Sequence, residues 1–500
     1  MTTAVLPLLL GLPLAGVAVL GLLPGRLEHL ARVIGTTVTG ATFAVSLAML
    51  AGFDYGRAGM QYELDVRWIP AVDVRFHLGV DGISLPLVVL TTLLTFLCAV
   101  LLLGRVPAPG RPRALLALML LLELGMLGTF VALDLLLFFV FFELVLAPMY
   151  FLIAVWGGSE RRGYAAMKFL LFTLLGSVLM LLGFLLIYAE TGTFDMVALA
   201  GRHGAGISRG VQDLAFLGLF LGFAIKSPMW PLHTWLPDAH TEAPTVGSVL
   251  LAGVLLKMGT YGFVRIALPD LPAAARDFAP YLGVLAVIGI VYGALCCLAQ
   301  RELKRLIAYS SVGHMGFVLL GIATLTPVGV NAALIGNLAH GLITGLLFFL
   351  VGALKERYGT ADMAEIGGGV LAKAPYLGGL LTAVAVASLG LPGLAGFWGE
   401  MLAMLGAFRP APGLPRELFL VLMVAAGIGT VLTTAYFLVL LRRVNQGVVP
   451  ARWRDVRFPD LATVELVAWT PLLALILAVG LWPRLVLGIT DAPVRALLGG

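Results

Sequence analysis

Residues 135–148 read LLLFFVFFELVLAP, an apolar run that contains a single acid, Glu143. Similar runs of apolar residues recur along the whole chain of 500 residues, of which 60% are hydrophobic and only 12% are charged. Soluble domains carry about 25% charged residues. The runs do not alternate between apolar and polar residues, as barrel strands do. Because lipid leaves every backbone group to be satisfied within the protein, we expect an all-α, polytopic membrane protein.

About fourteen segments are long and apolar enough to be transmembrane helices. They cover residues 4–24, 29–51, 81–104, 112–131, 134–156, 164–188, 214–236, 244–267, 277–299, 307–326, 331–354, 376–408, 418–442 and 464–488. The long connections are 52–80, 189–213, 355–375 and 443–463. None is large enough for a soluble domain, so we expect any nucleotide or redox cofactor to bind a partner chain.

Two of these segments are interrupted by proline. Residues 226–237 read KSPMWPLHTWLP in the seventh segment, and residues 389–396 read LGLPGLAG in the twelfth. Proline removes a backbone donor and clashes with the preceding turn, so we expect both helices to be broken. Broken helices at matching positions of two halves are typical of transporters with inverted repeats. Ordinary proline kinks, which are frequent in membrane helices, are the alternative.

The repeat interpretation divides the chain into four parts. Residues 1–111 hold three N-terminal helices, 112–267 a first five-helix repeat, 277–442 a second, inverted repeat, and 443–500 a connection and the last helix. With both termini outside, nineteen of the 32 Lys and Arg residues fall on the cytoplasmic side and eleven, Arg265 among them, fall outside. Basic residues favour the cytoplasmic side, so we expect both termini to be external.

Ionisable side chains within the apolar runs are the candidate functional residues. They are Glu143, Lys226, Lys257, His314, His340 and Glu400. Each costs about 2.5–3.5 kcal/mol to insert, so we expect them to face one another or water inside the bundle. A row of carboxylates, amines and imidazoles suits proton transfer. Movement of Glu143 relative to Lys226 would then switch the lysine between holding and releasing a proton.

Simpler roles are open for several of these residues. Glu143 and Lys226 can form a static ion pair, and His314 can be a hydrogen-bonded packing residue. Four further residues are secondary candidates: Glu123, His233, Asp238 and His240. Asp238 and His240 either conduct protons near the end of the seventh segment or cap helices. His233 shares a face with Lys226 only if the helix between them is continuous.

Four segments together resemble a known family. Residues 142–151 read FELVLAPMYF, 224–245 read AIKSPMWPLHTWLPDAHTEAPT, 247–259 read GSVLLAGVLLKMG and 304–316 read KRLIAYSSVGHMG. They closely resemble the antiporter-like subunits of respiratory complex I, the proton-translocating NADH:quinone oxidoreductase. The resemblance covers segments three to fourteen. Within the family it is to the M type, because Glu400 stands where the L and N types have lysine and no long lateral helix follows the last segment.

The resemblance implies a fourteen-helix subunit of a bacterial inner membrane that translocates protons, driven by quinone reduction in neighbouring subunits. It implies that Glu143 and Lys226 form a modulating pair, Lys257 is the central relay, His314 and His340 lie on a hydrated axis, and Glu400 is the terminal proton site. The expected partners are L-like and N-like paralogues, small membrane subunits and the lipid bilayer, with no nucleic acid.

No cofactor or metal is expected in this chain. Cys98, Cys296 and Cys297 form no CxxC pair, so FMN and iron–sulfur clusters are expected in partner subunits. Three alternatives are a subunit of a multisubunit cation/proton antiporter, a membrane subunit of a hydrogenase-type complex, and a scaffold that moves no protons.

Overall fold

The structure, a computed structural model, describes residues 4–457 and 459–499. Within these residues, twelve helical segments are long and apolar enough to cross a membrane. They are α1 (Val5–Leu22), α2 (Glu28–Ala51), α3 (Leu85–Gly104), α4 (Pro112–Val131), α5 with α6 (Leu135–Leu144 and Leu146–Trp156), α7 (Arg162–Thr191), the segment Thr245–Asp270, α14 (Pro272–Ala299), α15 (Leu303–Ala323), α16 (Pro327–Tyr358), α21 with its π-helical extension (Arg416–Asn445) and α23 (Thr463–Leu481).

Two further segments are interrupted where the prolines predicted breaks. The seventh consists of α9 (Arg209–Lys226) and α10 (Trp235–Glu242), and the twelfth of α19 (Pro375–Ser388) and α20 (Ala395–Phe408). In the second break, Gly390 and Gly393 have φ angles of 74° and 91°. These left-handed conformations favour glycine, which explains the glycines on either side of Pro392. The all-α fold and both breaks are therefore confirmed.

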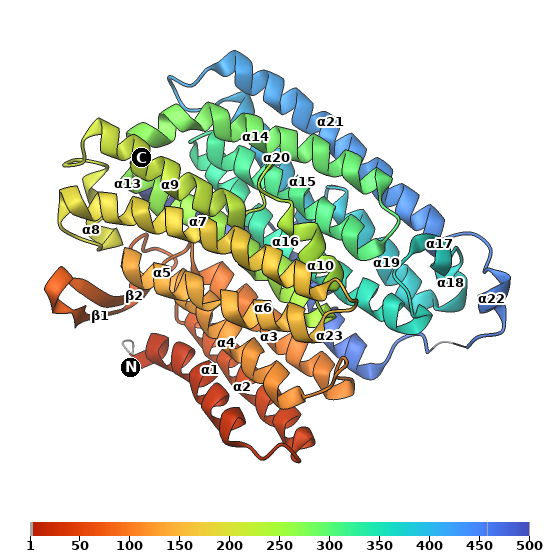
Figure 1. The fold of residues 1–500 in the computed structure, drawn as a ribbon. Helices are drawn as coiled ribbons and strands as arrows, with labels where there is room; N and C mark the ends of the chain where they lie inside the picture. The colour runs from red at the N-terminus through yellow and green to blue at the C-terminus, as the bar shows by residue number, and fades with distance from the viewer. Residues whose placement is uncertain (1–3, 458, 500) are drawn as a thin grey trace.

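The helices lie side by side in one bundle, with α1 and α2 along one edge and α21 along another (Figure 1). Both chain termini lie at the same end of the bundle, together with the hairpin of β1 (Gln61–Ile69) and β2 (Val74–Val80) and with α8 (Met196–Arg202). We call this the hairpin end. At the opposite end lie α17 (Met363–Ile366), α18 (Val370–Lys373) and α22 (Ala451–Arg454).

The centre of the bundle is formed by α16 and the segment Thr245–Asp270. In their most apolar windows 89% and 100% of residues are buried, against 33% for α1 and 28% for α2 and for α21. Helices with one buried stripe are suited to face lipid, whereas a helix buried all round must make its contacts with protein. The predicted ionisable residues of segments eight and eleven are thus placed in the interior.

The structure corrects three expectations from the sequence. The connection 52–80 contains an antiparallel hairpin, in which β1 pairs with β2. The last segment, expected over 464–488, ends at Leu481, and a separate helix α24 (Arg484–Leu497) follows Pro483. Arg265, assigned to an external connection, lies inside the segment Thr245–Asp270 with 7% of its surface exposed. Its burial follows from an ion pair described below.

Candidate functional site

Lys257 lies at the centre of the most buried segment. The segment consists of α11 (Thr245–Leu250), π-helical residues Leu251–Leu255, α12 (Leu256–Gly262), π-helical residues Phe263–Ala267 and α13 (Leu268–Asp270). A π-helical turn changes the backbone hydrogen-bond register and is frequent at functional sites. The Nζ of Lys257 donates to the carbonyl oxygen of Ala252 at 2.5 Å and lies 2.6 Å from Nδ1 of His340 on α16. Lys257 is therefore joined to the other central helix.

His340 leads on to His314 and Glu400. The ring centroids of the two histidines, on α16 and α15, are 5.9 Å apart. The Nδ1 of His314 is 3.1 Å from Oε1 of Glu400 on α20, and its Nε2 is 3.0 Å from the hydroxyl of Ser388 on α19. All four side chains line a cavity of about 30 Å³. A cavity of this volume has room for a water molecule, and these side chains offer it polar partners in a lining that is otherwise largely apolar.

Glu400 is held in place by close helix packing just after the break of the twelfth segment. It is 6% exposed, and its Oε2 accepts from the Thr430 hydroxyl at 3.4 Å. At the preceding position, a Cβ on Gly399 would lie 2.7 Å from the Cα of Gly336 on α16. Only glycine allows α20 to approach α16 so closely. Helix contact through small residues thus sets the position of Glu400.

Glu143 and Lys226 do not form the static ion pair that the sequence left open as an alternative. Lys226, the last residue of α9, is 2% exposed, and its Nζ lies 4.6 Å from the ring centroid of Phe142. Among the described residues, no hydrogen-bond partner is found for Lys226 Nζ or for Oε1 of Glu143, and no ion pair within 4.0 Å joins them. The static ion pair is therefore not present in this conformation.

The end of α9 that carries Lys226 packs against α12 at a glycine of α12. A Cβ on Gly259 would overlap the side chain of Ser227, the residue that follows Lys226. The end of α9 therefore packs directly on the helix that carries Lys257. A displacement of Lys226 would therefore be transmitted to α12.

The secondary candidates have different surroundings. Glu123 on α4 is fully buried, and neither carboxylate oxygen has a partner among the described residues. His233 lies in the break between α9 and α10, so no continuous helix face joins it to Lys226; its ring centroid is 5.2 Å from that of Tyr292. His240 on α10 stacks on Phe348, with centroids 4.5 Å apart.

Asp238 lies beside a polar cavity. Its Oδ2 accepts from Lys168 Nζ at 2.7 Å. The cavity has a volume of about 240 Å³, and Glu242, Glu302, Arg305 and Lys355 also line it. Burial raises the pKa of Glu302, while nearby lysines oppose the shift. The cavity therefore gathers carboxylates and cations close to α10, the helix of His240.

A buried polar network close to the hairpin end was not predicted from the sequence. Arg265 Nη2 donates to Asp81 Oδ1 at 2.5 Å, and Arg265 Nε donates to the Tyr261 hydroxyl at 3.2 Å. The Tyr261 hydroxyl donates to the Phe130 carbonyl at 3.0 Å. Asp81 also accepts from the backbone at the start of α3. An arginine two turns after Lys257 in an apolar run was the signal that this network existed.

The family assignment follows from comparison with known proteins. The family described as NADH:quinone oxidoreductase/Mrp antiporter, TM matches residues 132–433. The chain belongs to this family. NADH-quinone oxidoreductase subunit M of Rhodobacter capsulatus is 42% identical, covering 97% of this chain and 95% of the relative. NAD(P)H-quinone oxidoreductase chain 4 3 of Trichormus variabilis is 40% identical, covering 96% and 88%.

Solved structures share the whole fold. A chain of respiratory complex I from Thermus thermophilus is 32% identical, with a TM-score of 0.87 and full coverage of both chains. A chain of the Mrp complex from Dietzia sp. is 23% identical, with a TM-score of 0.86 over 99% and 97% of the two chains, which shows a common fold. The resemblance to the M type is thus confirmed, and the chain is an antiporter-like membrane subunit of a bacterial respiratory complex.

Proposed function

We propose that this subunit translocates protons within NADH:quinone oxidoreductase through Glu143, Lys226, Lys257, His340, His314 and Glu400, driven by quinone reduction in neighbouring subunits. The observation that carries the proposal is the row of ionisable groups from Lys257 to Glu400, all of them buried except the partly buried His314. They come from four different helical segments and are linked by contacts of 2.6 Å and 3.1 Å and by a small cavity whose lining includes both histidines and Glu400. Intramembrane ionisable groups are costly, and they typically mark proton or ion pathways.

The transfer follows from the donor and acceptor atoms. A charged Lys257 donates from Nζ toward Nδ1 of His340, and a proton that moves across this contact leaves a neutral amine and an imidazolium. The imidazolium then releases its other proton from Nε2 toward the cavity. His314 takes a proton on one ring nitrogen and passes the proton of its other nitrogen to Glu400. Each step exchanges one proton between neighbouring groups.

Glu143 and Lys226 have a modulating role in this proposal. A carboxylate that approaches the ammonium of Lys226 stabilises its charge, and a carboxylate that retreats destabilises it. The two groups are not paired in the present conformation, so the carboxylate of Glu143 can either approach or move away from Lys226. The contact of Ser227 with Gly259 supports transmission of the change to α12 and Lys257.

We propose that protons move from the end of the bundle that carries α17, α18 and α22, called the opposite end, to the hairpin end. The distribution of Lys and Arg favours a cytoplasmic opposite end and an external hairpin end with both termini, in the inner membrane. The cavity beside Asp238 and Glu242 then faces the cytoplasm and supplies protons by way of His240. FMN and iron–sulfur clusters are assigned to partner subunits, and L-like and N-like paralogues to the neighbouring positions.

The proposal is tested in the assembled complex, purified and reconstituted into liposomes. We expect Lys257→Met and Glu400→Gln to lower proton pumping and coupled quinone reduction by tenfold or more, on the order of the contribution of one proton-transfer group. Lys226→Ala and Glu143→Ala are expected to lower both while the complex still assembles. The matched control is Glu417→Gln, which removes an exposed carboxylate at the start of α21.

Two outcomes would reject the proposal. Normal pumping in both the Lys226 and the Glu143 variants, with the complex intact, would favour a scaffold. Purification of the chain without flavin or cluster subunits, together with cation-dependent proton exchange, would favour a multisubunit antiporter, whose fold this chain shares.

A further inference from the structure

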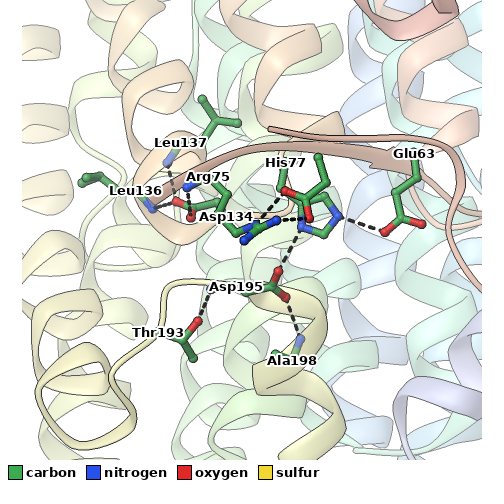
Figure 2. Close-up of polar contacts among 10 residues, drawn as sticks. Glu63, Arg75, His77, Asp134, Leu136, Leu137, Thr193, Asp195 and Ala198 are labelled. Atoms are coloured by element: carbon green, nitrogen blue, oxygen red, sulfur yellow. Dashed lines mark hydrogen bonds and ion pairs between the residues drawn. The ribbon is translucent and has the colours of Figure 1, made fainter. Parts of the chain in front are cut away.

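His77, on β2 at the hairpin end, has a carboxylate at each ring nitrogen. Its Nδ1 is 3.1 Å from Oδ2 of Asp195, and its Nε2 is 2.9 Å from Oε1 of Glu63 (Figure 2). The histidine is 4% exposed, so the ring is enclosed, and it lies on β2, outside the helices that carry the row of groups described above. His77 has no role in the proposed relay.

The three residues join parts of the chain that are distant in sequence. Glu63 belongs to β1, and Asp195 caps α8 by accepting from the Ala198 amide at 2.7 Å. Backbone hydrogen bonds run alongside: the Leu133 amide donates to the His77 carbonyl, and the Met196 amide donates to the Leu133 carbonyl, both at 2.9 Å. These contacts form one layer from the hairpin, the start of α5 and the connection between α7 and α8. The ring of His77, on β2, lies between Glu63 of β1 and Asp195 at the start of α8.

The chemistry of the ring makes this arrangement depend on a proton. Ionised carboxylates only accept hydrogen bonds, and a neutral imidazole has a single N–H to donate. In the neutral ring one nitrogen lone pair would therefore face a carboxylate oxygen. Only the imidazolium, which donates from both nitrogens, satisfies Glu63 and Asp195 together.

The other charged groups around the ring are already paired or capped. Asp65 on β1 accepts from Arg75 on β2 at 2.7 Å and 2.6 Å. Asp134, the cap of α5, accepts from the Arg75 amide at 3.1 Å and from the amides of Leu136 and Leu137 (Figure 2). These groups leave His77 as the one residue of the cluster whose hydrogen bonds require an added proton.

We propose that His77 is a proton-binding site which, when protonated, locks the hairpin onto the start of α8, and which releases it when the proton leaves. A consequence rests on the proposed function: the start of α8 is hydrogen-bonded to Leu133, just before α5, and α5 carries Glu143, so the lock would adjust the distance between Glu143 and Lys226. The proton concentration outside the membrane would then regulate the relay.

The direction of the pH dependence follows from the surroundings of the ring. Burial lowers the pKa of His77, but the hydrogen bonds to Asp195 and Glu63 and the nearby carboxylates raise it above its usual value in total. A histidine with a raised pKa in the folded state stabilises the fold below its ordinary pKa of about 6.5. This stabilisation is lost as the pH rises through the raised pKa. The lock is therefore closed at acid pH and open at alkaline pH.

The test measures hydrogen exchange by mass spectrometry in the assembled complex between pH 5.5 and 8.5. Rates are divided by those of an unstructured reference peptide, which removes the intrinsic effect of pH. We expect the exchange of residues 74–80 and 193–199 to rise with pH, at up to about tenfold per unit for one linked proton. His77→Gln, which keeps a polar side chain that does not titrate, should remove this rise.

Two further variants make the result specific. Glu63→Gln should move the rise to lower pH, because one carboxylate that favours the imidazolium is gone; its side chain is 45% exposed, so the fold should tolerate the change. His203→Asn, which removes an exposed histidine just after α8, should change nothing.

A flat wild-type profile, or an unchanged rise in His77→Gln, would overturn the lock. If His77→Gln does not assemble, an unshifted profile in Glu63→Gln would overturn it. The exchange measurement does not depend on pumping. A pH-dependent lock in a complex whose Glu143→Ala and Lys226→Ala variants pump normally would reject the relay and leave the lock standing.

Discussion

Substitution of Gly399 by alanine tests whether helix contact positions the relay. The added Cβ would lie 2.7 Å from the Cα of Gly336, whereas carbon atoms in contact are about 3.5–4.0 Å apart. The two helices must therefore separate by about 1 Å. Alanine favours a helix interior by about 0.5–1 kcal/mol, but overpacking costs about 1–3 kcal/mol, so a modest net destabilisation is expected.

The larger effect is expected on proton transfer. Glu400 follows Gly399 directly, and its contact with His314 is 3.1 Å long. A displacement of about 1 Å would lengthen this contact beyond the usual range of a hydrogen bond. Misplacement by this amount can cost a reaction about a hundredfold, so we expect pumping in reconstituted complex to fall by at least about tenfold.

Two other glycines provide graded controls. A Cβ on Gly336 would meet a Val318 methyl at 3.1 Å, a contact that the flexible side chain can relieve, so Gly336→Ala should be milder. Gly379 on α19 has nothing within 4 Å of a Cβ, so Gly379→Ala should pump normally. Equal pumping in all three variants, with equal amounts of assembled complex, would refute the reasoning.

Two further predictions concern other buried groups. Removing one partner of the buried ion pair, by Asp81→Leu or Arg265→Leu, should destabilise the subunit by about 3–5 kcal/mol, while the double substitution should recover much of this loss. The control is Arg495→Ala, which breaks an exposed ion pair and should change the thermal unfolding temperature little. If Asp81→Leu and Arg265→Leu lower that temperature no more than Arg495→Ala does, the prediction is contradicted. Glu400→Lys should retain more pumping than Glu400→Gln, because an amine beside His314 still carries a proton; equal loss in a pumping assay would argue against a titrating group at this position.

The family and the buried ionisable residues were predictable from the sequence. The hydropathy of a segment is a local property of the sequence, so the apolar runs predicted the transmembrane helices. The prolines at 228 and 392 predicted the two helix breaks. The motifs around Glu143, Lys226 and Lys257 led to the family, which the comparisons confirmed. The hairpin was missed although residues 62–68 read YELDVRW, an alternation of apolar and polar residues that is typical of a strand, because the prediction rested on long apolar runs.

Partnerships among these residues could not be predicted in the same way. The sequence indicated that Glu143 and Lys226 act as a pair but not how far apart they lie, and in the structure Lys226 faces the ring of Phe142. Lys257 has no nearby acid in the sequence, and its partner is His340, 83 residues away. Such pairs lie on different helices, and their distances depend on how the helices pack.

The sequence by itself determined that this chain enters a membrane as helices with ionisable groups in their interior, because insertion free energy is a property of each segment. Tertiary structure alone decided which groups meet. Close approach at Gly399 and Gly259, and hydrogen bonds such as those of His77, fix distances to within an ångström. Proton exchange depends on those distances, because a proton passes only between groups that a hydrogen bond or a water molecule connects.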